Sequence, residues 1–130
     1  MATSTKLTGA TAAAVLPVED YARAKSFYED HVGMVVKDVP GMDGMGMLQA
    51  GNGTQVMLYQ RARTKAEHTV LSFEVDDLEG VVGDLRQHGV EFEEYSTPEL
   101  TTDHGIAHMG DSLSAWFTDP EGNVVSINQM

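Results

Sequence analysis

Few side chains in this sequence of 130 residues could do chemistry, and none forms a recognised catalytic pattern. There is no cysteine, which excludes disulfide bonds, thiolate metal sites and a cysteine nucleophile. His104 and His108 lie near Asp103, and two histidines with a carboxylate can bind a metal ion. Histidines in a polar stretch are more often simply exposed, so this trio indicates a loop.

Acid–base catalysis would need an ionisable side chain beside an apolar cleft. Glu74, Tyr59 and His104 are the candidates for that role, although nothing else in the sequence demands it. The glycine-rich stretch 41–46 lacks the lysine and the following helix of a phosphate-binding loop. We therefore assign no catalytic residue.

The composition is that of one compact globular domain. Hydrophobic residues make up 42% of the sequence, and there are only four prolines. The net charge of −12 argues against nucleic acid as a partner, because phosphate binding needs clustered lysine and arginine. The same charge favours solubility and would attract a cationic small molecule. Eight methionines are many for this length, and methionine adapts to irregular cores and binding surfaces.

Nothing in the sequence predicts a membrane segment or a targeting signal. No run of about 18 apolar residues occurs. The stretch 1–15 is small and polar, and it lacks the charged-then-apolar layout of a signal peptide. We expect a soluble, cytoplasmic protein with no membrane partner.

The elements that would position the side chains repeat along the chain. In the first half, strands are expected at residues 12–18, 35–39, 45–50 and 54–60. Asp20 is a good N-cap for a helix after the first strand, and Gly33 ends that helix. In the second half, strands are expected at residues 69–75, 90–95, 113–118 and 123–128. Asp77 caps the corresponding helix, Gly89 ends it, and a longer loop covers residues 96–108.

The two halves are related by ordered offsets. A shift of 57 residues places Asp20 on Asp77, and a shift of 69 places Gly53 on Gly122. The increase of 12 indicates an insertion near residues 97–108. We therefore predict a single domain over residues 1–130, with a first module at about 12–60, a linker at 61–67 and a second module at about 68–129.

Alternation along the strands gives the sheets two different faces. One face carries only large apolar residues and is expected beneath the helices: Leu16, Val18, Leu48, Val56, Leu58, Leu71, Phe73, Val75, Phe117, Val125 and Ile127. The other face is too apolar for solvent and too polar for a core, as expected for a small-molecule cleft. We predict its ligand-binding residues to be Met45, Met47, Gln55, Met57, Tyr59, Val70, Ser72, Trp116, Ser126 and Asn128.

The types of these side chains suggest how a ligand would be held. Trp116 and Tyr59 would stack on flat rings, while the methionines would adapt to the shape of the ligand. The serines and amides would orient it through hydrogen bonds. The apolar face suits a large aromatic ligand, whereas the net charge favours a cationic one. Packing of the same face against a partner chain is an alternative that the sequence leaves open.

Two stretches of the chain resemble a known family. Residues 27–33 (FYEDHVG) and 117–123 (FTDPEGN), within the tandem βαβββ order, resemble the vicinal oxygen chelate superfamily. That superfamily includes glyoxalases, extradiol dioxygenases, fosfomycin resistance enzymes and bleomycin resistance proteins. The resemblance implies an α+β fold of two tandem βαβββ modules, whose mixed sheets curl around a cleft with the helices on the convex face. It also implies a homodimer.

Enzymes of this family commonly hold a divalent metal with His and Glu side chains on four strands. Transferred position by position, those ligands fall on Ala13, Met57, Val70 and Ser126. None of these residues binds a divalent metal in the usual way. We therefore expect no metal and no other cofactor.

The sequence thus favours a metal-free binding protein of the bleomycin-resistance type. It would confer resistance by sequestering a small-molecule natural product, such as an antibiotic, without turnover. The main alternative is a metal-independent isomerase, cyclase or lyase of secondary metabolism on the same fold. A third alternative is a module whose sheet face binds only a partner.

Overall fold

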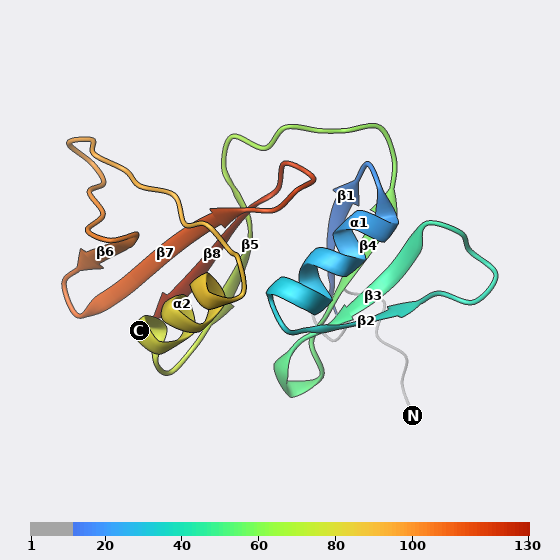
Figure 1. Cartoon of the computed structure of the whole chain (residues 1–130), viewed down its shortest axis with the longest axis horizontal. Coiled ribbons are helices and arrows are strands. Elements are labelled where there is room, and N and C mark those ends of the chain that lie inside the picture. The colour runs from blue at the N-terminus through green and yellow to red at the C-terminus, as the bar shows by residue number, and fades with distance from the viewer. Residues whose placement is uncertain (1–11) are drawn as a thin grey trace, which may run out of the picture.

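The computed structural model describes residues 12–130, which form two mixed four-stranded sheets, each with its own helix (Figure 1). The first sheet has the order β1-β4-β3-β2, with strands β1 (Ala14–Val18), β2 (Val35–Asp38), β3 (Met45–Gln49) and β4 (Gln55–Gln60). The second sheet has the order β5-β8-β7-β6, with strands β5 (Thr69–Glu74), β6 (Ile106–Met109), β7 (Ser112–Thr118) and β8 (Val124–Gln129). β1 pairs in parallel with β4, and β5 pairs in parallel with β8. All the other strand pairs are antiparallel. The predicted α+β fold of two related modules is confirmed.

The helices begin and end where the sequence predicts. The Asp20 carboxylate accepts the backbone N–H of Arg23 at 3.1 Å, and Asp77 accepts that of Gly80 at 3.1 Å. These are N-caps of the same geometry, three residues before the bonded amide. The first helix is α1 (Tyr21–Ser26), which continues as a π-helical turn, η2 (Phe27–His31), and the second is α2 (Leu78–Gln87). A short 3-10 turn, η3 (Gly51–Gly53), joins β3 to β4.

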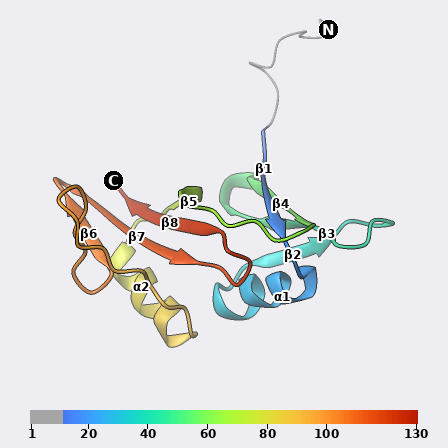
Figure 2. The same ribbon diagram turned by 90° about the horizontal axis from the view of Figure 1, so that it is seen from above.

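The face predicted to be the core does lie beneath the helices. In the first module, Leu16, Leu48 and Leu58 are almost completely buried together with Ala24 of α1. In the second module, Phe117 and the neighbouring strand residues pack against the apolar side of α2. Leu71, Phe73 and Val75 of this face are only half-buried. Figure 2 shows both helices on the same side of the sheets, so within residues 12–130 no helix covers the opposite faces.

The strand predicted at residues 90–95 is wrong. This segment is irregular and bonds β7 through one backbone contact, from the Glu93 N–H to the Trp116 carbonyl at 2.8 Å. The place beside β7 belongs instead to β6, which falls in the loop predicted at 96–108. A tight turn at Gly110 and Asp111 joins β6 to β7, with φ +63° at Gly110. Such a short loop closes at a lower entropic cost than pairing with the more distant segment 90–95.

A β-bulge overturns the predicted position of Val70. The pairing of β5 with β8 shifts register between Thr69 and Leu71. The extra residue interrupts the alternation of side chains, and Val70 packs against the core of the first module. Thr69 lies on the open face instead, where it contacts Trp116.

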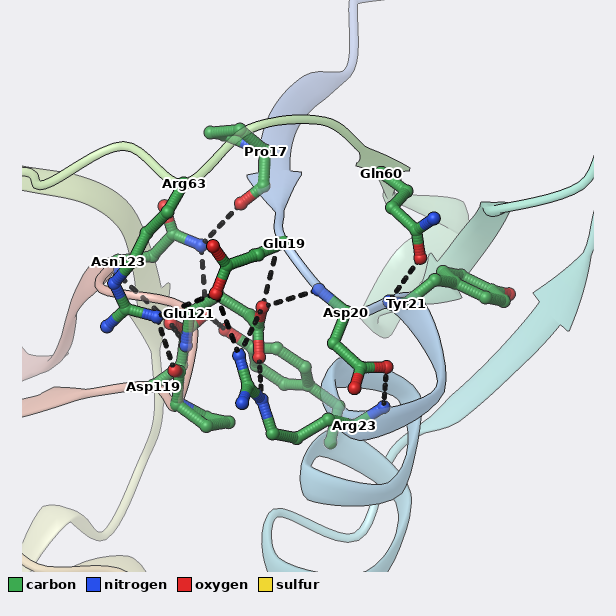
Figure 3. A network of polar contacts seen from close by, with 12 residues as sticks. Pro17, Glu19, Asp20, Tyr21, Arg23, Gln60, Arg63, Asp119, Glu121 and Asn123 are labelled. Atoms are coloured by element: carbon green, nitrogen blue, oxygen red, sulfur yellow. Dashed lines mark hydrogen bonds and ion pairs between the residues drawn. The ribbon is translucent and has the colours of Figure 1, made fainter.

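A polar network joins the two modules, between the start of α1 and the turn from β7 to β8 (Figure 3). The Glu121 side chain has no exposed surface, and its Oε1 accepts the backbone N–H groups of Glu19 at 2.8 Å and Asp20 at 2.9 Å. The second module therefore caps the helix of the first. Arg23 donates from Nε to Glu121 Oε2 at 2.6 Å. Burial alone would raise the pKa of Glu121, but the bonds from Arg23 and the two amides outweigh it and lower that pKa.

A second group of contacts completes this junction. The Tyr28 hydroxyl donates to Asp119 Oδ2 at 2.7 Å, and the two residues are 0% and 3% exposed. Asp119 Oδ1 accepts the backbone N–H groups of Glu121 at 2.9 Å and Asn123 at 2.8 Å. Asn123 Nδ2 donates to the Pro17 carbonyl at 3.0 Å, which ties the turn to β1. The two stretches that resemble the family therefore meet in space.

No helix within residues 12–130 is long and apolar enough to cross a membrane.

Candidate functional site

An open pocket of about 380 Å³ is lined by Trp116, on the face of the second sheet opposite α2. We call it the Trp116 pocket, and its lining consists of Ala66, Glu67, His68, Thr69, Tyr95, Leu100, Trp116 and Val124. The indole Nε1–H donates to Thr69 Oγ1 at 3.1 Å, which fixes the ring on the sheet. Tyr95 meets Trp116 edge to face, with ring centroids 5.5 Å apart and an interplanar angle of 86°. The pocket therefore offers two perpendicular aromatic walls.

The wall that carries Tyr95 and Leu100 is a loop held at its base. The Tyr95 N–H donates to Thr102 Oγ1 at 2.8 Å, and the Thr102 N–H donates to the Tyr95 carbonyl at 2.9 Å. Glu94 accepts the Thr102 hydroxyl at 2.7 Å and the Gly105 N–H at 2.6 Å, and these two bonds lower the pKa of Glu94. Burial, and after it the charge of Glu93, raise the pKa of Tyr95. Tyr95 is therefore held beside Trp116 as a neutral phenol.

Four polar side chains form a network on the same sheet: Ser72, Ser114, Ser126 and Asn128. The Ser72 and Ser126 hydroxyl oxygens are 2.6 Å apart, and Asn128 Nδ2 donates to both. Ser114 Oγ donates to Asn128 Oδ1 at 2.8 Å. Ser126 pairs directly with Trp116 across β7 and β8. The predicted orienting groups of the second module are thus brought together, and they form hydrogen bonds with one another.

The predicted residues of the first module lie on a separate surface, the first-module face: Met45, Met47, Gln55, Met57 and Tyr59. Met47 pairs with Met57 and Met45 with Tyr59 across β3 and β4, and these four side chains are half-buried. Gln55 donates to Gln49 Oε1 at 2.9 Å. None of these residues lines the Trp116 pocket. Their contact with a ligand stays a prediction.

Tyr95 and Leu100 are two of the seven pocket residues that the sequence analysis missed. Tyr95 was assigned to a strand, and Leu100 to a loop without a function. The available signal was the insertion in the second module, because a long loop beside an open sheet face is a common source of binding residues. Trp116 is the one predicted ligand-binding residue that lines the pocket among those the structure describes.

A smaller apolar hollow of about 170 Å³ lies on the helix-covered side, between α2 and the end of the first module's helix. Phe73, Val75 and Met34 line it, which explains why two predicted core residues are only half-buried. Glu74, an acid–base candidate, also lines this hollow. Tyr59 lies on the first-module face, and His104 pairs with Asp103 at 2.8 Å in an exposed position. None of the three acid–base candidates lines the Trp116 pocket.

The side chains at the four metal positions do not fit a divalent cation. Ala13 has no donor atom, Val70 has an apolar side chain that packs against the core of the first module, and the Ser126 hydroxyl is hydrogen-bonded to Ser72. Met57 offers a thioether, which is too soft a ligand for Mg²⁺ or Mn²⁺. Within residues 12–130, no three His, Cys, Asp or Glu side chains gather in a way that could hold a metal ion. His108 lies on β6, opposite Leu113, so the predicted loop trio does not form a site.

Solved structures with this arrangement include several proteins of similar length. TnmS3, an antibiotic binding protein from a Streptomyces species, aligns with a TM-score of 0.63 and 25% identity, over 94% of this chain and 98% of that chain. A glyoxalase/bleomycin resistance protein from Catenulispora acidiphila aligns at 0.65 with 19% identity, over 90% and 95%. FosX, a fosfomycin resistance protein from Listeria monocytogenes, aligns at 0.65 with 10% identity, over 94% and 91%. A search of curated protein sequences gives no significant match.

The sequence itself provides the decisive comparison. A profile of the Glyoxalase/Bleomycin resistance protein/Dioxygenase superfamily matches residues 10–127, which is almost the whole chain. The two mixed sheets, their parallel first and last strands and the paired helix caps agree with that match. The chain therefore belongs to the Glyoxalase/Bleomycin resistance protein/Dioxygenase superfamily.

Proposed function

We propose that this protein binds a small-molecule natural product in the Trp116 pocket and acts by stoichiometric capture, without a metal and without turnover. The observation that carries the proposal is the pair of perpendicular aromatic walls, Trp116 and Tyr95, in a pocket that Glu74, Tyr59 and His104 do not line. The likeness to TnmS3, which is described as an antibiotic binding protein, supports it.

The aromatic walls of the pocket and the polar network beside it would contribute to binding in different ways. A flat ring placed on the Trp116 indole would meet the edge or the hydroxyl of Tyr95. The neighbouring network around Ser126 is already hydrogen-bonded within itself, so it holds a fixed pattern of polar atoms. A preformed site of this kind loses little conformational entropy when the ligand binds.

We further propose a homodimer in which a second copy of the chain covers the first-module face. Met45, Met47, Met57 and Tyr59 are half-buried on an open sheet, and Val15 beside Met57 is 51% exposed. A contiguous apolar face of this kind is typical of a protein interface or a ligand cleft. A mass of twice that of the chain in size-exclusion chromatography with light scattering would support the dimer, and a monomer would refute it.

Capture is tested by giving the protein to a bacterial host that is sensitive to bleomycin and to daunorubicin. We expect protection that rises in proportion to the amount of protein, and a bound compound that is recovered with unchanged mass. Quenching of the single tryptophan should report binding to the purified protein, because Trp116 lines the pocket.

Two variants define the result. Trp116→Ala should abolish binding and protection, whereas Met109→Ala, on the exposed β6, should leave both unchanged. A recovered compound of altered mass would show that the protein acts by catalysis and not by capture. Binding that survives in Trp116→Ala would show that the ligand lies elsewhere.

A further inference from the structure

We propose that the ligand of the Trp116 pocket is a planar aromatic molecule that carries a cationic group, and that Glu67 receives this group. The inference rests on the proposed function, since it names the chemical class that the same pocket selects. It resolves a question that the sequence leaves open, between a large aromatic ligand and a cationic one.

The charged groups in the lining have one sign. Glu67 contributes a carboxylate, and neither lysine nor arginine lines the pocket. Glu67 is exposed at the pocket rim and takes part in no ion pair within residues 12–130. It precedes His68 and Thr69, which line the same side, and Thr69 bonds the Trp116 indole. A cation beside Glu67 would therefore leave its aromatic ring within reach of Trp116.

The opposite wall adds to the negative potential. The segment 91–103, which supplies Tyr95 and Leu100, contains five acidic residues and no lysine or arginine. Glu93 is near enough to contribute to the raised pKa of Tyr95, after the larger effect of burial. Charges of one sign around a partly enclosed pocket concentrate ligands of the opposite sign. The indole face itself also attracts a cation.

Two nearby arginines contact other partners, and a nearby lysine does not line the pocket. Arg63 donates to the Pro120 carbonyl at 3.1 Å and lies 3.9 Å from Glu19. Arg86 donates to the His104 carbonyl at 2.6 Å and stacks on Phe92, on the far side of the loop. Lys65 neighbours Ala66 in the chain but does not line the pocket. These cations therefore leave Glu67 free to receive the ligand's charge.

Three probes with one ring system test the inference: 9-(aminomethyl)anthracene, 9-anthracenemethanol and 9-anthracenecarboxylate. Energy transfer from Trp116 to anthracene measures binding of each probe to the full chain at about pH 8. We expect the ammonium probe to bind about tenfold more tightly than the alcohol, and the carboxylate more weakly than both. The preference should shrink between about 20 mM and about 500 mM salt.

The variant Glu67→Gln should bring the ammonium and alcohol probes to within about twofold of each other, because only the charge is removed. Glu79→Gln is the matched control, since Glu79 is an exposed glutamate at the start of α2 and does not line the pocket. It should keep the full preference.

The outcomes separate this inference from the proposed function. If the ammonium and alcohol probes bind equally, and Trp116→Ala weakens both, the pocket stands and the cationic preference is overturned. A preference that persists in Glu67→Gln overturns the role of Glu67. Tighter binding of the carboxylate overturns the inference directly. If none of the probes binds, the pocket assignment fails and the inference fails with it.

Discussion

Replacing Tyr28 by phenylalanine removes a single hydroxyl group from the junction of the two modules. That hydroxyl donates to Asp119 Oδ2 at 2.7 Å in a site where both residues are buried. The ring keeps its place, because its edge-to-face contact with Phe27, with centroids 5.1 Å apart, does not need the hydroxyl. The substitution therefore measures the hydrogen bond and very little else.

The magnitude follows from the charge of the acceptor and from what remains around it. A hydrogen bond to a charged group contributes about 1.5–3 kcal/mol to stability. Asp119 Oδ2 would keep its bond from Asn123 Nδ2 at 3.0 Å, so part of the carboxylate stays satisfied. We expect Tyr28→Phe to lower the free energy of unfolding by about 2 kcal/mol, which corresponds to about 7 °C in Tm for a domain of this size.

Urea denaturation, followed by circular dichroism, measures this loss. Tyr59→Phe is the matched control, since Tyr59 is a half-buried tyrosine on the first-module face, and it should change stability by less than about 0.5 kcal/mol. A loss below about 0.5 kcal/mol in Tyr28→Phe would refute the reasoning, because the buried carboxylate would then not depend on the hydroxyl.

The same bond has a pH signature. Burial, and after it the charge of Asp119, raise the pKa of Tyr28 well above its ordinary value. A raised pKa means that the folded protein holds the proton more tightly than the unfolded chain. Stability from this source is complete below about pH 10, where an unfolded tyrosine titrates, and falls as the pH rises further. Tyr28→Phe should therefore flatten the alkaline loss of stability, and an unchanged alkaline slope would contradict the assignment.

Three further predictions concern the junction, the loop and metal. Glu121→Gln should lower the free energy of unfolding by about 1.5–3 kcal/mol near neutral pH, since a neutral amide binds the Arg23 guanidinium less strongly than a carboxylate does. Because the pKa of Glu121 is lowered, the stability that its carboxylate contributes is lost as the pH falls below about 4.3. The acid unfolding curves of wild type and variant should therefore converge. Thr102→Val should release the loop that carries Tyr95, which limited proteolysis would detect as faster cleavage within residues 96–101, while Thr54→Val, whose hydroxyl bonds only Gly51 in the first module, leaves the rate unchanged. Dialysis against EDTA should leave Tm and probe binding unchanged, and a loss of either would show that a metal acts here after all.

The elements that followed from the sequence are those with local causes. Asp20 and Asp77 cap their helices because each carboxylate can reach the backbone amide three residues later in the chain, whatever the surrounding structure is. The core face followed from strict alternation of large apolar residues. The strand at 106–109 is missed because the sequence analysis assigns 96–108 to a loop and takes no account of the Gly110-Asp111 turn, a hairpin signal. Val70 is misplaced by the sequence analysis because the bulge, which interrupts the alternation in the structure, leaves no mark on the pattern of residue types.

The site was predictable only in part. Trp116 could be placed on the open face from its position between buried neighbours, Ala115 and Phe117, on one strand. Tyr95 could not, because its place beside Trp116 depends on the contacts between Thr102, Glu94 and Gly105 that hold an irregular loop. Loop conformation of this kind is decided by tertiary contacts and leaves no periodic pattern in the sequence.

The two stretches that carry the family resemblance identify the fold because of what their side chains do. Tyr28 of the first stretch and Asp119 of the second bond each other, and Glu121 of the second caps the helix that leads to the first. None of these residues lines the Trp116 pocket. In this chain the two stretches therefore join the modules and lie apart from the Trp116 pocket. The proposed binding of a ligand rests instead on Trp116, Glu67 and the loop that carries Tyr95.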